Sequence, residues 1–342
     1  MSFTKEQILE SLKKVLYFPK GSNVVDLDMV DRLTIEGNKV SLALVYPQAN
    51  DKNAHIVKDA AERTLKADLG NEAEILIDTL SEQEAGRGPL GKVKNIIAIA
   101  SGKGGVGKST VASNLAIALA KTGAKVGLLD ADIYGPSMPV MFGLNGERPG
   151  AKEEDGKTKI LPIEKYGIKM LSIGFFIEAH KALMWRGSMA SNALNQLFND
   201  AVWGELDYLF IDTPPGTGDE HLTIVQEIKE NLNAIIVTTP QNVAVDDVMK
   251  SISFCNTLRL NILGIVENMS GFVCPKCGEI THIFDKDGGK KVSKKTGLKL
   301  LGEIPLEREI GESCETGSPF INNFKSQIAF DAYKKIIDNL NL

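Results

Sequence analysis

The chain has 342 residues, of which 43% are hydrophobic and 24% charged, with a formal net charge of −5, as is typical of a soluble globular protein. The acidic balance argues against nucleic acid or an anionic membrane as the main partner, and no run approaches the roughly 18 apolar residues of a membrane-spanning helix. An N-terminus without a signal peptide's apolar stretch and a total of four cysteines argue against a secreted, disulfide-stabilised protein, so we expect a cytoplasmic location.

Residues 1–80 form the first predicted domain, a small α+β unit. Thr4 and Gln7 have the spacing of a capping box, and the apolar residues after them recur on one helical face. Further along, apolar runs typical of strands flank a segment with helical periodicity. The strand, helix and strand expected there are 39–47, 53–69 and 74–80.

Residues 81–94 contain three glycines and a proline and interrupt every period, so we interpret them as a linker. The second predicted domain, 95–342, consists of short apolar runs separated by helical segments. Runs of this kind suit strands that are covered on both faces, so we predict an α/β fold with a mostly parallel sheet flanked by helices. The predicted strands are 95–101, 125–130, 168–174, 207–212, 234–240, 262–269 and 299–305.

The first of these strands leads into SGKGGVGKST, residues 101–110, which satisfies the pattern G-x-x-x-x-G-K-[ST]. Glycines let the backbone wrap a phosphate chain with its N–H groups inward, and the following helix adds its positive N-terminal end. We expect Lys108 to reach the β and γ phosphates of ATP and the Ser109 hydroxyl to ligate Mg²⁺. The sequence therefore predicts a P-loop NTPase. The loop residues expected to bind nucleotide are Gly102, Lys103, Gly104, Gly105, Val106, Gly107, Lys108, Ser109 and Thr110.

Two further predicted strands are followed by carboxylates. Asp212 closes the strand 207–212 in the manner of a Walker B aspartate, so we expect it to hold the Mg²⁺ shell through water. Asp130 closes an earlier strand, and Asp132 follows it; we expect Asp130 to have a supporting role. The glycine-containing segment 213–219 is a candidate for a switch that rearranges when the γ-phosphate leaves.

Cys274 and Cys277 have the C-x₂-C spacing that lets two sulfurs face one metal. Four interpretations remain open on the residues alone: half of a zinc site, a redox dithiol, a structural pair, or half of an iron–sulfur site completed by a second subunit. Of the other two cysteines, Cys255 is expected to be a small buried residue in a helix, and Cys314 to lie in a loop.

The loop GKGGVGK resembles the deviant Walker A motif of the MinD, ParA and nitrogenase-iron-protein group. This resemblance implies a homodimer with ATP between the subunits, in which Lys103 reaches the partner's phosphates. It also implies that Asp132 lies in a switch and orients the lytic water, and that Asn268 and Pro305 contact the base. The implied catalytic residues are Lys103, Lys108, Asp132 and Asp212.

The ordered motifs GKGGVGKS, DADIYGPSMP, WRG, DTPPGTGD and ENMS-x₃-CPKCG resemble the Mrp/ApbC iron–sulfur carrier ATPases from residue 95 to about 340. The resemblance implies slow ATP hydrolysis and a [4Fe–4S] cluster held by Cys274 and Cys277 of two subunits. Apoproteins and cluster-assembly factors are the implied partners. Arg186, in WRG, is expected at the dimer face. Residues 1–80 resemble the small domain that often precedes these ATPases, but they lack its cysteine.

A positioning or partition ATPase like MinD or ParA is the alternative, with the thiols as a structural pair or a zinc site. Such a protein needs a membrane-targeting helix or a basic DNA-binding surface. The C-terminal segment offers one candidate, since four apolar residues lie roughly on one face of the expected helix: Phe330, Tyr333, Ile337 and Leu340. Electron transfer in the manner of nitrogenase iron protein fits less well, because the cluster cysteines of that protein are far apart in sequence.

Overall fold

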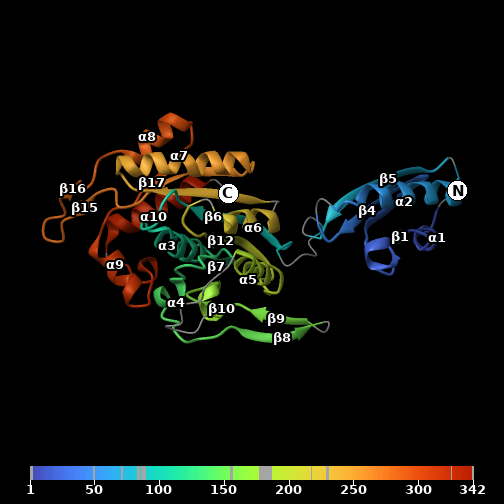
Figure 1. Cartoon of the computed structure of the whole chain (residues 1–342), viewed down its shortest axis with the longest axis horizontal. Helices are drawn as coiled ribbons and strands as arrows, with labels where there is room; N and C mark the ends of the chain where they lie inside the picture. The colour runs from blue at the N-terminus through green and yellow to red at the C-terminus, as the bar shows by residue number, and fades with distance from the viewer. Residues whose placement is uncertain are drawn as a thin grey trace. The chain divides into compact units, whose positions relative to one another are not determined.

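Two compact units make up the chain, Met1–Lys92 and Val93–Leu342 (Figure 1). Each unit has its own hydrophobic core. The division falls within the predicted linker 81–94, of which residues 83, 84 and 86–89 lie outside the described residues. The computed structural model describes residues 3–48, 51–70, 72–82, 85, 90–154, 157–176, 187–216, 218–228, 231–324 and 326–340.

The first unit combines a three-stranded sheet with two helices. Helix α1 begins at the expected capping box, because the Thr4 side chain accepts a hydrogen bond from the Gln7 N–H and the Gln7 side chain accepts one from the Thr4 N–H. Strands β3 and β4 are antiparallel, whereas β4 and β5 are parallel and are joined through α2. The elements are α1 (Lys5–Leu12), β1 (Leu16–Tyr17), η1 (Phe18–Lys20), β2 (Ser22–Asn23), β3 (Val30–Glu36), β4 (Lys39–Tyr46), α2 (Ala54–Leu69) and β5 (Glu74–Ser81).

Alternation along the strands creates the core of this unit. In β4, Val40, Leu42 and Leu44 point to the same face and join the buried cluster that includes α1 and α2. Helix α2 buries Val57, Ala61 and Leu65, which recur at the spacing of one helical turn. This face of the sheet is therefore covered by helices whose apolar stripes match it.

The second unit is built on an eight-stranded sheet in the order β10-β11-β7-β12-β6-β13-β14-β17. Every neighbouring pair is parallel except β10 and β11. All seven predicted strands lie in this sheet, and the predicted α/β fold class is confirmed. The strands are β6 (Val93–Ala100), β7 (Val126–Asp130), β10 (Ile163–Lys165), β11 (Ile168–Ser172), β12 (Leu206–Asp212), β13 (Leu232–Thr238), β14 (Asn261–Glu267) and β17 (Leu300–Glu303).

Helices cover both faces of this sheet, and two short hairpins lie outside it (Figure 1). The hairpins are β8 (Gly150–Glu154) with β9 (Lys157–Leu161), and β15 (Phe272–Val273) with β16 (Ile280–Thr281). The helices are α3 (Lys108–Ala120), α4 (Met138–Met141), η2 (Ile173–Phe176), α5 (Gly187–Asn199), α6 (Asp219–Glu227), α7 (Asn242–Thr257), α8 (Gly288–Thr296), α9 (Arg308–Glu315), η3 (Phe320–Asn322) and α10 (Gln327–Leu340).

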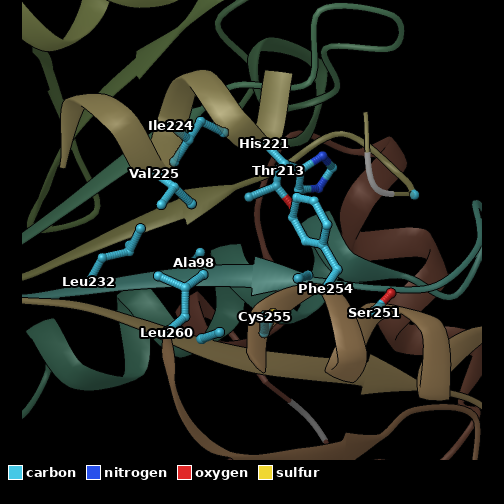
Figure 2. A pocket seen from close by; sticks show the side chains of 13 residues that line it. Ala98, Thr213, His221, Ile224, Val225, Leu232, Ser251, Phe254, Cys255 and Leu260 are labelled. Atoms are coloured by element: carbon cyan, nitrogen blue, oxygen red, sulfur yellow. The ribbon is translucent and has the colours of Figure 1, made fainter. Parts of the chain in front are cut away.

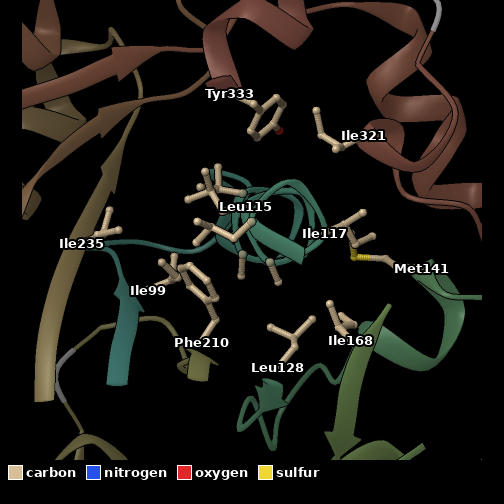
Figure 3. Close-up of a cluster of buried hydrophobic side chains, with 14 of the residues drawn as sticks. Ile99, Leu115, Ile117, Leu128, Met141, Ile168, Phe210, Ile235, Ile321 and Tyr333 are labelled. Atoms are coloured by element: carbon tan, nitrogen blue, oxygen red, sulfur yellow. The ribbon is translucent and has the colours of Figure 1, made fainter. Parts of the chain in front are cut away.

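Helix α3, which follows the glycine-rich loop, lies at the centre of the main core. Figure 3 shows Ile99 and Phe210 of the sheet on one side of this helix and Tyr333 on the other. Nine of its 13 residues are buried, as expected for a helix that is covered all round. The glycine-rich loop is therefore held at its C-terminal end by a helix that cannot shift without disturbing the core.

Helix α10 packs on the same side of the sheet as α3, whereas α7 and α8 pack on the opposite side through residues such as Ile252 and Val292. Of the four apolar residues that the sequence placed on one face of the C-terminal helix, Tyr333 and Leu340 are buried, and the other two are partly buried against the core. The apolar face that a membrane-targeting helix would need is thus packed inside the protein. None of the helices in the described ranges is both long and apolar enough to span a bilayer.

Candidate functional site

Residues 101–107 connect β6 to α3 and form the predicted phosphate loop. Gly105 and Gly107 have φ values of +78° and +84°, in the left-handed region that glycine adopts without strain. Gly107 is the N-cap of α3 and contributes no side chain, so no cap occupies the first-turn N–H groups of the helix. Free N–H groups at a helix N-terminus favour an anion, which is what phosphate binding requires.

Neighbouring segments hold this loop from outside. A Cβ on Gly102 would lie under 3.0 Å from the backbone of Asp247 in α7, so only glycine permits this close approach. The Asn268 side chain donates from Nδ2 to the Val106 carbonyl at 2.9 Å. Asn268, expected at the base, is therefore in contact with the loop itself.

Lys103 lies against its own chain in the structure. Its Nζ atom donates to Oε1 of Gln241, just before α7, at 3.0 Å. Lys108, by contrast, is only 6% exposed and lies within the first turn of α3. The two lysines of the loop thus have different surroundings in the single chain, and the action of Lys103 on a partner subunit stays a prediction.

Asp212 closes β12 beside the phosphate loop. Both of its carboxylate oxygens are buried, and neither has a hydrogen-bond partner among the described residues. Burial raises the pKa of Asp212 to about 6, while the Lys108 ammonium and the Ser109 hydroxyl favour the ionised form. A buried carboxylate without a well-formed hydrogen bond is costly unless a cation satisfies it. Together with the Ser109 hydroxyl it provides the oxygen ligands that Mg²⁺ prefers, so these residues fit that ion.

Asp130 closes β7 and is paired with Asp212 in the parallel register of the sheet. Its carboxylate accepts hydrogen bonds from Oγ of Ser172 at 2.8 Å and from the N–H groups of Met138 and Asp132 at 3.2 Å. Burial and then the charge of Asp212 raise the pKa of Asp130 to about 8. Asp130 therefore ties together two strand ends and the loop that carries Asp132.

Asp132 and the residues after it link the two loops expected to act as switches. Oδ1 of Asp132 accepts hydrogen bonds from the N–H groups of Tyr134 and Gly135, each at 3.2 Å. The Tyr134 hydroxyl donates to Oε1 of Glu220 in α6 at 2.6 Å. Sequence reasoning missed Tyr134 and Glu220, because neither residue has a defined role in a motif. Thr217, within the segment expected to be the second switch, lies outside the described residues.

His221 was also missed. It is 6% exposed, and neither ring nitrogen has a hydrogen-bond partner among the residues that the structure describes. Figure 2 shows its imidazole beside Phe254 of α7, and the two rings meet edge to face with centroids 5.9 Å apart. Burial lowers the pKa of His221, so the ring is neutral at pH 7. The apolar cavity beside it measures about 20 Å³, room for about one water and far too small for a nucleotide.

Cys274 and Cys277 lie in the exposed turn between β15 and β16. The Gly278 N–H donates to the Cys274 carbonyl at 2.8 Å, and the φ value of +73° at Gly278 closes this turn. The N–H groups of Cys277 and Lys276 lower the pKa of Cys274, because they stabilise the thiolate. A partly exposed thiol whose thiolate form is stabilised by neighbouring N–H groups is suited to bind a soft metal ion.

The other two cysteines have different environments. Cys255 is 3% exposed in α7, and burial raises its pKa to about 11, so it is an unreactive core residue. Cys314 lies in α9 and not in a loop as expected; its Sγ atom is 3.6 Å from Oγ1 of Thr110, since α9 packs beside the phosphate loop. Within the described ranges, no group of three or more His, Cys, Asp or Glu side chains is arranged to hold a metal ion.

Pro305, the second residue expected at the base, lines a groove of about 310 Å³ together with Ile280 of β16 and Ile328 of α10. His282 anchors the base of the hairpin, because its Nδ1 atom lies 3.0 Å from the Ser270 carbonyl oxygen. Arg186, expected at a dimer face, lies outside the described residues.

Family models match both units of the chain. The model described as NUBPL iron-transfer P-loop NTPase matches residues 92–341, and the model described as iron-sulfur cluster assembly protein matches residues 5–77. The first match covers more than two thirds of the chain and includes both the phosphate loop and the cysteine hairpin.

Individual proteins show the same similarity. The chain is 49% identical over 264 residues to the iron-sulfur cluster carrier protein of Methanocaldococcus jannaschii, which covers 76% of this chain and 89% of that protein. It is 40% identical over 323 residues to the iron-sulfur cluster carrier protein of Synechocystis sp., and the match covers 93% of this chain and 91% of that protein. A nucleotide-binding protein of Archaeoglobus fulgidus, solved with ADP, superposes with a TM-score of 0.62 at 37% identity, covering 73% of this chain and 96% of that one.

Proposed function

The chain belongs to the NUBPL iron-transfer P-loop NTPase family, and on that premise we propose that it is an ATP-hydrolysing carrier that delivers an iron–sulfur cluster to apoproteins. The observation that carries this proposal is the exposed turn that presents Cys274 and Cys277, with the Cys274 thiol biased towards thiolate. Thiolates are the ligands of iron–sulfur clusters, and an accessible turn allows a cluster to enter and leave.

Two thiols are half of the four that a [4Fe–4S] cluster takes. In a homodimer, Cys274 and Cys277 of each subunit would together supply all four. Oligomers of this kind usually have two-fold symmetry, and a two-fold axis next to the hairpin brings the two turns together. We therefore assign the cluster as cargo bridged between two subunits. The first unit contributes no thiol to it, because all four cysteines lie after residue 92.

ATP would bind along residues 102–110, with Lys108 neutralising its terminal phosphates. Mg²⁺ held by Ser109 and Asp212 would supply further positive charge against those phosphates. Asp132 would orient the attacking water, and its carboxylate is close enough to affect the pKa of Asp212. Lys103 would leave Gln241 and reach the phosphates of the partner subunit, so hydrolysis would require the dimer.

The structure offers a short route from the nucleotide to the cargo. Asn268 contacts the phosphate loop at the end of β14, and Cys274 lies six residues further along the chain. Between them, the Ser270 N–H donates to the Ile304 carbonyl at 2.9 Å, which keeps this segment in register with β17. A shift of the phosphate loop would thus reach the hairpin through one continuous segment. We infer that slow ATP turnover controls loading or release of the cluster by this route.

Anaerobic reconstitution with iron and sulfide tests the proposal. The wild type should give a brown dimer with about four irons per two chains, measured by visible and Mössbauer spectra and by mass in solution. Cys274→Ala/Cys277→Ala should stay colourless. Cys314→Ala is the matched control, since it removes a part-buried thiol outside the hairpin. A wild type that stays colourless, or a double variant that colours equally, contradicts the carrier function.

A further inference from the structure

Helix α8 follows the cysteine hairpin and lies in a strongly positive segment. Residues 286–299 contain six lysines and one aspartate, a formal charge of +5 in a chain whose net charge is −5. All six lysines are exposed. We define them as the lysine face: Lys286, Lys290, Lys291, Lys294, Lys295 and Lys299.

Close packing at the first turn of α8 holds the lysine face in position. A Cβ on Gly288 would lie 2.8 Å from Cα of Pro240, and one on Gly289 would lie 2.9 Å from a methyl group of Leu300, so both glycines are needed for close packing. The Gly289 N–H donates to the buried carboxylate of Glu267 at the end of β14. One turn later, Val292 is fully buried. The opposite side of the helix therefore faces solvent, and the lysines project from a fixed position.

Part of the positive charge is not neutralised by neighbours. Lys290 forms ion pairs with Asp287 and Glu303, at 2.7 and 3.1 Å, and Lys291 forms one with Asp285, at 3.0 Å. Lys294 and Lys295, near the C-terminal end of the helix, have no carboxylate within 4.0 Å in the part of the chain that the structure describes. Lys294 follows Lys290 by four positions, and Lys295 follows Lys291 by four, so the lysines repeat along one side of the helix.

The lysine face continues into the apolar groove beside the hairpin. Glu303, the partner of Lys290, lines this groove of about 310 Å³ together with Ile280 of β16 and Ile328 of α10. Ile280 and Ile328 are 50% and 44% exposed, although both are large apolar residues. Ile280 lies three residues after Cys277, so the groove begins at the cluster turn. The charged residues that line the groove are Glu303, Asp331 and Lys335, and an exposed apolar groove edged by charge is typical of a protein interaction site.

We propose that the lysine face and this groove together dock the apoprotein that receives the cluster, through an acidic surface that inserts an apolar side chain into the groove. This inference rests on the proposed carrier function, because the groove begins at the thiols that would release the cargo. Complementary charge would orient the recipient and speed its encounter with the hairpin. The two-fold axis proposed above lies beside the thiol turn; an axis at α8 itself would instead bring two copies of the lysine face together, which like charges disfavour.

The test measures binding and transfer separately. The probe is the apo form of a small acidic [4Fe–4S] ferredoxin, whose affinity for the nucleotide-free chain is measured by fluorescence anisotropy at about 50 and 500 mM salt. The variants are Lys294→Glu/Lys295→Glu and Ile328→Asp, all at exposed positions outside the nucleotide and thiol sites. Lys20→Glu/Lys52→Glu is the control, since it makes the same change of charge on the exposed surface of the first unit.

We expect the lysine variant to weaken ferredoxin binding at least about tenfold at low salt and less at high salt, with a parallel fall in the cluster transfer rate. Ile328→Asp should weaken binding at both salt concentrations, and the control should match the wild type. Unchanged binding in the lysine variant, an equal loss in the control, or tighter binding of anionic vesicles or DNA than of ferredoxin at the same face would overturn the inference. Failure of the carrier function would instead appear as an uncoloured wild type, while the binding comparison still decides the docking site.

Discussion

Replacing Gly102 by alanine tests how the phosphate loop is held. The added Cβ would lie 2.7 Å from Cβ of Asp247 and nearer still to its backbone, whereas ordinary contacts are 3.4–4 Å. The loop or α7 must therefore retreat by about 1 Å, and overpacking of this kind costs about 1–3 kcal/mol. If the loop is the part that moves, this energy must be spent to return the loop to the geometry that binds nucleotide. Gly102→Ala should then weaken binding of MgADP by about 5- to 150-fold, at about 1.4 kcal/mol for each factor of ten.

Gly104→Ala provides the matched control in the same loop. The nearest atom to a Cβ there is Cβ of Pro215 at 3.9 Å, and Gly104 is not among the residues with positive φ. Calorimetric titration with MgADP should show a loss of affinity for Gly102→Ala, and urea unfolding should show a loss of stability for the same variant. The stability of Gly104→Ala should stay within about 0.5 kcal/mol of the wild type. The reasoning is refuted if Gly102→Ala binds MgADP as the wild type does, or if both variants lose stability equally.

Three further variants probe other parts of the second unit. Lys103→Ala should lower the ATP hydrolysis rate at least about 100-fold but change the Kd for ATP less than about threefold, because this lysine is proposed to act on the partner's nucleotide. Burial raises the pKa of Asp130 to about 8, so between about pH 4 and pH 8 the unfolded chain ionises this carboxyl while the native state keeps it protonated, and the free energy of unfolding falls as the pH rises. Asp130→Asn should remove this pH dependence, and urea unfolding in EDTA should show a gain in the free energy of unfolding over the wild type that grows across that window to on the order of 5 kcal/mol. The Tyr333 hydroxyl is buried without a hydrogen-bond partner in the described ranges. Tyr333→Phe should therefore leave the free energy of unfolding, measured in urea, unchanged or raise it by about 1 kcal/mol. A loss above about 1 kcal/mol would show that the hydroxyl has a partner.

Seven of the eight strands in the sheet of the second unit were predictable because they are continuous apolar runs, whereas the short edge strand β10, Ile163–Lys165, was missed because it carries two charged residues. Continuous runs such as 207–212 mark strands that helices cover on both sides, and all seven runs became strands of one sheet. Strand β3 of the first unit was missed, because it carries a register shift between Asp31 and Thr34, where Arg32 has a positive φ of 50°. The hairpins β8–β9 and β15–β16 were missed as well. They lie outside the main sheets, so no apolar run marks them.

Residue types and spacing alone pointed to the phosphate loop and the two thiols, because their chemistry depends on local geometry. Tyr134, Glu220 and His221 could not be found this way. The bond between Tyr134 and Glu220 joins residues 86 positions apart, and the partner ring of His221, Phe254, lies on another helix. Such contacts depend on which strand ends lie side by side, and that order follows from the packing of the whole sheet.

The end of β14 joins the phosphate loop, the lysine-rich helix and the cluster turn. The Glu267 carboxylate accepts from the first turn of α8, and the adjacent Asn268 side chain donates to the phosphate loop. Both side chains are buried, although burying polar groups is costly unless they form hydrogen bonds. Because successive side chains of a strand point to opposite faces, two neighbouring residues can hold elements on the two sides of the sheet. A displacement of this strand end would move the nucleotide contact and the first turn of α8 together, so we expect nucleotide state and recipient docking to be coupled here.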